Sequence, residues 1–306
     1  MNGTRKDFLI GSLGLAAAAR LTGCRTAAVP PPEPLEGEDA LGLWQREADQ
    51  VESETYKAYM RGEVPAESRV SFVKLEAGFD RVLREIDAAD VSAHPAVWMA
   101  YNMGVVVKTR ESLFSIDLVH RRAAELAPRL DFALITHNHG DHYRPEFYQE
   151  MNGARKTVIS NFLDNYGVRD WMKNGGFTRA EKTFRIRDVE IRTSLVDHNG
   201  YLVDFTTAFE IKVGDWLMYH TGDCGNANKL RTTWGRPDLW VAFPGCGVNI
   251  AAGQRKVQPK LMAIGHVLEL GHRRGRLTVP MVRAAREKVL AAGGAVSVPF
   301  WGERIV

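Results

Sequence analysis

The chain has 306 residues, with 40 lysines and arginines against 37 aspartates and glutamates and a net charge of +3. A composition of 45% hydrophobic and 25% charged residues is typical of a globular protein and excludes a disordered, collagen-like or coiled-coil chain. Three cysteines are too few for a disulfide scaffold, and the small positive charge does not indicate a nucleic-acid partner. No apolar run reaches the roughly 18 to 20 residues that a membrane-spanning helix needs.

The first 24 residues have the organisation of an export signal. Arg5 and Lys6 precede an apolar stretch at 8–19, which suits a signal peptide but is too short to span a bilayer. The stretch is followed by Leu-Thr-Gly-Cys at 21–24, which resembles a bacterial lipobox. That resemblance implies that Cys24 is lipidated and becomes the first residue of the mature protein.

The segment 4–9 also resembles a twin-arginine signal in which Lys6 replaces the second arginine, so the Tat and Sec export routes both stay open. Prolines at 29–34 favour an extended polyproline II spacer. We therefore predict a signal peptide at 1–23 and a lipidated cysteine with a proline-rich tether at 24–37. The mature protein would be a bacterial lipoprotein attached to a membrane on the periplasmic or extracellular side.

Two amphipathic segments come next, at 38–60 and 70–87, because their apolar residues recur at helical spacing. We interpret residues 38–92 as a helical segment that packs on the flank of the main domain. A separate helical module is the alternative.

Many short strands mixed with helices follow from residue 93. Strands are predicted at 96–101, 105–108, 112–116, 131–136, 156–160, 181–186, 188–195, 201–212, 215–220, 238–243 and 260–264. Helices are predicted at 120–127, 144–151, 163–173, 225–232 and 279–292. This mixture without a repeat favours a layered α/β sandwich.

The strongest chemical signal is Thr-His-Asn-His-Gly-Asp-His at 136–142, directly after a strongly apolar predicted strand. Four potential metal ligands, His137, His139, Asp141 and His142, fall within six residues. Imidazole and carboxylate groups suit zinc and other divalent metals of the first transition row. Two imidazoles and an adjacent Asp-His pair in one short run cannot easily all bind one tetrahedral zinc ion, so the run itself indicates two cations.

The run resembles the H-x-H-x-D-H signature of the metallo-β-lactamase superfamily. This resemblance implies an αββα sandwich over 93–306, preceded by the short helical segment, and three further ligands in the order His, Asp, His. His198, Asp223 and His266 follow predicted strands in that order. The resemblance covers residues from about 95 to about 300.

The resemblance divides the seven ligands into two trios and a bridge. It implies one cation bound by His137, His139 and His198, a second bound by Asp141, His142 and His266, and Asp223 between them. Two divalent cations about 3.5–4 Å apart share a hydroxide nucleophile and lower its pKa towards neutrality. Asp141 is the implied catalytic proton acceptor. Zinc is the expected metal, and manganese or iron would suit the same donors.

Several neighbours of these ligands have open roles. His272 is a rival for the last ligand, or contacts the substrate or the ligands with Glu269 as its orienting carboxylate. His220 and Asp197 are either second-layer residues of the site or ordinary packing, and Asp117 resembles a structural aspartate of the superfamily.

Other polar residues have weaker claims. Cys224 is a minor candidate ligand, and Cys246, His94 and His120 are expected to be structural. Four residues are candidates for lining a substrate pocket, each with ordinary packing as the alternative: Trp171, Phe177, Tyr201 and Arg255.

An aspartate at 223, where some true β-lactamases have cysteine, is usual in the phosphodiesterase, lactonase and thioesterase branches. Gly-His-x-x-Glu-Leu-Gly-His at 265–272 resembles the branch of ascorbate-6-phosphate lactonase and N-acyl-phosphatidylethanolamine phospholipase D. We therefore expect a lipid-anchored dinuclear hydrolase that cleaves an ester, lactone or phosphodiester in a small or lipid-like substrate. The alternatives are a non-catalytic metal-binding lipoprotein and a glyoxalase-like thioester hydrolase.

Overall fold

The computed structural model describes residues 38–162, 175–177, 181–199, 201–272 and 276–306. The predicted signal peptide, Cys24 and the tether lie outside the described residues, as do the predicted helix at 163–173 and Trp171. The part of the chain after Glu36 forms one compact unit. Within the described ranges, no helix is both long and apolar enough to cross a membrane.

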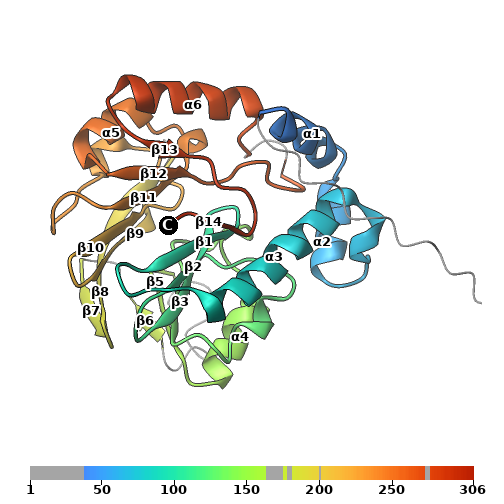
Figure 1. The fold of residues 1–306 in the computed structure, drawn as a ribbon, viewed down its shortest axis with the longest axis horizontal. Coiled ribbons are helices and arrows are strands. Elements are labelled where there is room, and N and C mark those ends of the chain that lie inside the picture. The colour runs from blue at the N-terminus through green and yellow to red at the C-terminus, as the bar shows by residue number, and fades with distance from the viewer. Residues whose placement is uncertain (1–37, 163–174, 178–180, 200, 273–275) are drawn as a thin grey trace, which may run out of the picture. The chain divides into compact units, whose positions relative to one another are not determined.

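Two β-sheets face each other at the centre of this unit (Figure 1). The first has the order β14-β1-β2-β3-β4-β5-β6. Its strands are β1 (Ala96–Tyr101), β2 (Gly104–Lys108), β3 (Leu113–Ile116), β4 (Phe132–Leu134), β5 (Thr157–Ser160), β6 (Gly175–Phe177) and β14 (Glu303–Arg304). The second has the order β13-β12-β11-β10-β9-β8-β7. Its strands are β7 (Thr183–Ile186), β8 (Val189–His198), β9 (Leu202–Val213), β10 (Trp216–His220), β11 (Leu239–Ala242), β12 (Leu261–Ile264) and β13 (Val296–Ser297).

Helices cover the outer face of each sheet, as Figure 1 shows, so the layers run helix, sheet, sheet, helix. The first sheet is covered by α3 (Val70–Ala88) and α4 (Pro145–Gly153), and the second by α5 (Ile250–Val257) and α6 (Val279–Ala291). The predicted αββα sandwich is confirmed.

Successive side chains of each strand point to opposite faces of its sheet, so each sheet packs against the other sheet on one face and against helices on the other. In β1, Val97 and Met99 point into the core between the sheets, whereas Trp98 points outward among side chains of α3. On the other side, Trp240 of β11 packs against Ile250 and Val257 of α5. The central strands β1, β4 and β11 are buried on both faces, which explains the continuous apolar runs in the sequence.

The candidate site lies where parallel strands end. In the first sheet β3, β4 and β5 run parallel, and in the second β10, β11 and β12 do so. Parallel neighbours bring their carboxyl ends to one edge of the sheet, where the following loops gather.

Three helix predictions need correction. The segment 38–60 is two helices, α1 (Glu38–Asp49) and α2 (Ser53–Met60), because the last turn of α1 closes tightly and Val51 is buried after it. The segment 120–127 holds only a 3-10 turn at Ala123–Glu125, since Pro128 disfavours helix at the residue before it. At 225–232 only Ala227–Lys229 is helical, because the Asn226 side chain accepts the Asn228 N–H and closes a single turn.

Candidate metal centre

Asp117 braces the start of the histidine-rich loop. It follows β3, is fully buried, and holds a left-handed backbone with φ of 48°. One carboxylate oxygen accepts the Thr136 N–H at 2.7 Å, and the other accepts the Thr136 hydroxyl at 2.7 Å and lies 2.8 Å from His142 Nδ1. One carboxylate thus fixes both the backbone that leaves β4 and the His142 ring.

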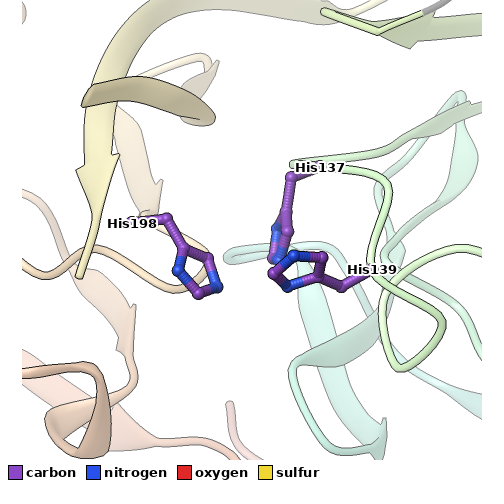
Figure 2. A group of neighbouring side chains, drawn as sticks. All are labelled: His137, His139 and His198. Carbon is purple, nitrogen blue, oxygen red and sulfur yellow. The ribbon is translucent and has the colours of Figure 1, made fainter. Parts of the chain in front are cut away.

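The first trio brings together His137, His139 and His198 (Figure 2). Their ring centroids lie 4.6 to 5.0 Å apart. The first two come from the loop after β4 and the third from the end of β8, so the trio joins the two sheets. Thr136 Oγ1 lies 3.0 Å from His137 Nδ1, which leaves the other ring nitrogen of His137 for the centre of the trio.

The second group brings together Asp141, His142, Asp223 and His266. The Nε2 atoms of His142 and His266 lie 3.0 Å apart, and Asp223 Oδ1 lies 3.1 Å and 3.0 Å from them. Asp141 Oδ2 is 3.4 Å from His142 Nε2 and 3.7 Å from His266 Nε2. Four donors from three different loops therefore converge on one point.

Asp223 touches both groups. Its Oδ1 faces His142 and His266, whereas its Oδ2 lies 3.6 Å from His198 Nε2. Gly222, at φ of 48°, allows the turn that brings Asp223 here, because a Cβ on this glycine would lie 2.7 Å from Thr136 Oγ1.

The charges of this cluster depend on one another. Burial opposes protonation of His142, but Asp223, Asp141 and Asp117 outweigh it and raise the pKa of His142 well above its usual value. Burial likewise opposes protonation of His266, yet Asp223 and Glu269 raise its pKa to about 10. Burial would raise the pKa of Asp223, but His142 and His266 lower it well below its usual range. The carboxylates therefore attract positive charge to the centre.

His137 and His139 behave in the opposite way. Burial, together with the charge of His142, lowers the pKa of His137 well below its usual value, and burial lowers that of His139. The Nε2 atoms of His137 and His198 are buried without a hydrogen-bond partner among the described residues. Buried imidazole nitrogens without a hydrogen-bond partner are costly unless a cation occupies the space between them. Both groups of donors therefore fit divalent metal ions.

No protein-family model and no curated protein sequence matches the chain. Solved structures do resemble it. CmlA, a diiron β-hydroxylase from Streptomyces venezuelae, matches with a TM-score of 0.58 and 14% identity over 69% of this chain and 54% of its own. Igni18, a metallo-hydrolase from Ignicoccus hospitalis, matches with a TM-score of 0.53 and 16% identity over 69% of this chain and 97% of its own. YhfI from Bacillus subtilis, a metallo-β-lactamase fold protein, matches with a TM-score of 0.51 and 12% identity over 69% of this chain and 98% of its own.

This chain has the metallo-β-lactamase fold. It spans only about half of the CmlA chain but nearly all of Igni18 and YhfI. The seven residues that the sequence singled out as ligands lie together at the edge where the two sheets of this fold open.

His266 and His272 occupy different places in the metallo-β-lactamase fold of this chain. His266 is buried against the cluster, with its ring stacked on Phe243 at 4.0 Å between centroids. The His272 side chain is 55% exposed. Glu269 Oε2 lies 3.2 Å from Nδ1 of each histidine, and its hydrogen bond raises the pKa of His272. The geometry thus places His266 among the donors and His272 beside Asp141, on the exposed side of the cluster.

His220 and Asp197 are buried but turned to the backbone. His220 Nε2 lies 2.9 Å from the Met103 carbonyl, and its Nδ1 accepts the Gly222 N–H. Asp197 accepts hydrogen bonds from the Asp204 N–H and the Asn226 side chain. Both residues hold the loops that carry His198 and Asp223.

The two cysteines after the predicted lipobox differ in their position relative to the metal ligands. Cys224 donates to the Asn226 carbonyl, and burial raises its pKa to about 11. Cys246 Sγ lies 3.8 Å from His198 Nδ1, and it forms a possible ligand group with His198 and Asp223. No spacing in the sequence indicates this contact, because the end of β8 and the loop after β11 meet only in the folded chain.

His94 and His120 lie outside the metal cluster, as expected, whereas two of the candidates for lining a substrate pocket, Tyr201 and Arg255, are exposed on the surface. His94 Nδ1 lies 2.8 Å from the Pro95 carbonyl, and His120 stacks on Phe79, where burial lowers its pKa to about 3. Tyr201 is 90% exposed, and Arg255 is exposed on α5. The Phe177 side chain lies outside the described residues. Phe205, which the sequence did not single out, lies 5.3 to 5.8 Å from the three rings of the trio.

Proposed function

We propose that this protein is a metal-dependent hydrolase with a dinuclear site. The observation that carries the proposal is Asp223, whose two oxygens face the two groups of donors. One cation is assigned to His137, His139 and His198, and the other to Asp141, His142 and His266. A donor set of imidazoles and carboxylates favours zinc, and manganese or iron suits it as well.

A pair of bound divalent cations would supply Lewis acidity and lower the pKa of a water molecule. The chain's own groups then have distinct tasks. Asp141, the most exposed carboxylate of the cluster, accepts the proton of the attacking water. The half-exposed His272, with its imidazole held by Glu269, contacts the substrate. Buried Phe243 and Asp117 keep the ligand rings in place.

The proposed substrates are small or lipid-like esters, lactones or phosphodiesters. This choice follows the resemblance to the lactonase and phospholipase branch, and the bridging aspartate supports it. The test is turnover by purified, metal-loaded protein on a panel of phosphodiesters, lactones, carboxylic esters, thioesters and a β-lactam.

Hydrolysis of a phosphodiester, lactone or ester, lost in His139→Ala, is the expected result. Turnover confined to thioesters would favour the glyoxalase-like alternative. Stoichiometric metal without turnover on any member would favour a metal-binding lipoprotein and contradict the enzyme.

We also propose that the protein is exported and anchored through a lipid on Cys24. The support is the order of charged, apolar and lipobox segments over residues 1–24. In a bacterial host, labelled palmitate should enter the full-length chain and stay in the membrane fraction. Cys24→Ala should abolish the label, with Cys246→Ala as the matched control that keeps it. Equal labelling of both variants would refute the anchor.

A further inference from the structure

The short helix α2 lies outside both sheets, yet it touches the two loops that carry the second group of donors. Figure 1 shows α2 beside α3, at the edge of the sandwich. Its first link is at its carboxyl end, where Arg144 Nη2 donates to the Met60 carbonyl at 2.8 Å. Arg144 is two residues after His142 in the histidine-rich loop.

The second link is Tyr56, in the middle of α2. It packs directly on Gly271, which has a left-handed φ of 72°, and a Cβ on that glycine would lie 2.7 Å from the Tyr56 Cβ. The Tyr56 ring is 6.1 Å from the ring of Tyr101, at the end of β1. The Tyr101 hydroxyl in turn accepts the Leu270 N–H at 2.7 Å. Two tyrosines thus hold the turn at 269–271.

That turn determines where Glu269 lies. Glu269 is 2% exposed, and its carboxylate reaches His266 Nδ1 at 3.2 Å. His266 and Leu268 both have left-handed backbones, with φ of 58° and 55°, which residues other than glycine adopt only when their surroundings impose it. The conformation of this loop therefore depends on contacts outside it, and α2 supplies one of them.

We propose that α2 is a positioning element of the metal centre. Through Tyr56 it holds the turn at 269–271, and the turn holds Glu269 against His266. A carboxylate bonded to the far nitrogen of a ligand histidine orients the ring and makes it more basic, and its loss typically lowers metal affinity about 10- to 100-fold. The inference rests on the metal assignment of the proposed function and not on the substrate.

The test is a zinc titration of the full chain against a competing chromophoric chelator, which resolves two binding constants. His266→Ala identifies the constant that belongs to the second cation. Tyr56→Ala should weaken that constant about tenfold or more and leave the first unchanged. The first cation is an internal control for general unfolding, because no hydrogen bond or ring contact among the described residues joins His137, His139 or His198 to the turn.

A smaller change tests the same role if Tyr56→Ala folds poorly. Tyr101→Phe removes only the hydroxyl that accepts the Leu270 N–H, and it should weaken the same constant. Tyr219→Phe is the matched control, since its buried hydroxyl accepts the Arg231 N–H at a distance from the turn.

Unchanged constants in both Tyr56→Ala and Tyr101→Phe, or equal losses at both cations, would overturn the positioning role while leaving the hydrolase proposal intact. A wild type that binds no zinc would contradict the metal centre itself, and the positioning role with it.

Discussion

Asp223→Ala is expected to lose bound metal from both halves of the site and to lose hydrolysis. Asp223 is the one carboxylate whose two oxygens face both groups of donors among the described residues. Removing it leaves His142 and His266 with their nitrogens 3.0 Å apart and one fewer negative charge between them. Loss of a residue that only orients a ligand costs about 10- to 100-fold in affinity, so loss of this ligand should cost more than about 100-fold. Metal analysis after gel filtration, with turnover on the active panel member, measures both effects.

Asp188→Asn is the matched control for this variant. Asp188 is also a carboxylate that accepts hydrogen bonds, from Thr109 and Ser112, but it lies at the turn between β7 and β8 and outside the cluster. It should keep the full metal content. If Asp223→Ala retained the wild-type metal content, the bridging role would be wrong.

Asp117→Ala is expected to have the largest effect on stability. Its carboxylate is fully buried, accepts two hydrogen bonds from Thr136 and pairs with His142. Breaking a buried charge pair by removing one partner costs about 3–5 kcal/mol. Alanine is also less suited than aspartate to the left-handed backbone at this position. Urea unfolding of the chelator-treated protein gives the free energy of unfolding directly.

Asp117→Asn separates the shape of this side chain from its charge. Asparagine tolerates the left-handed backbone and still accepts the Thr136 N–H, but its amide nitrogen cannot accept from the hydroxyl or from His142. The free energy of unfolding of Asp117→Asn should lie between those of wild type and Asp117→Ala. A free energy of unfolding for Asp117→Ala within about 0.5 kcal/mol of wild type, the range of ordinary surface substitutions, would show that this brace is unimportant.

The layered fold could be predicted from the sequence because its central strands are buried on both faces and are separated by turn residues. The strand from 131 to 136 and the ligand-rich loop after it are local features that need no knowledge of distant contacts. The three later donors were predicted by resemblance; His198 is the last residue of β8, and Asp223 and His266 follow β10 and β12. Helices were predicted less well, since Pro128 and the Asn226 side chain ended two of them after a single turn.

The sequence could not predict contacts that join distant segments. Cys246 beside His198, Phe243 against His266 and Tyr56 against Gly271 each join residues that are at least 23 positions apart. The packing of the two sheets and of α2 creates these contacts, and no spacing in the chain signals them. The choice between His266 and His272 as the last ligand was open for the same reason, because only the fold buries His266 and exposes His272.

Metal content with anomalous scattering at the zinc edge tests the dinuclear centre most directly. The purified domain after residue 37, loaded with zinc and freed of excess, should hold two equivalents. Two anomalous peaks should lie one on each side of Asp223, the first among His137, His139 and His198 and the second among Asp141, His142 and His266. A single peak, or zinc bound away from Asp223, would contradict this account of the site.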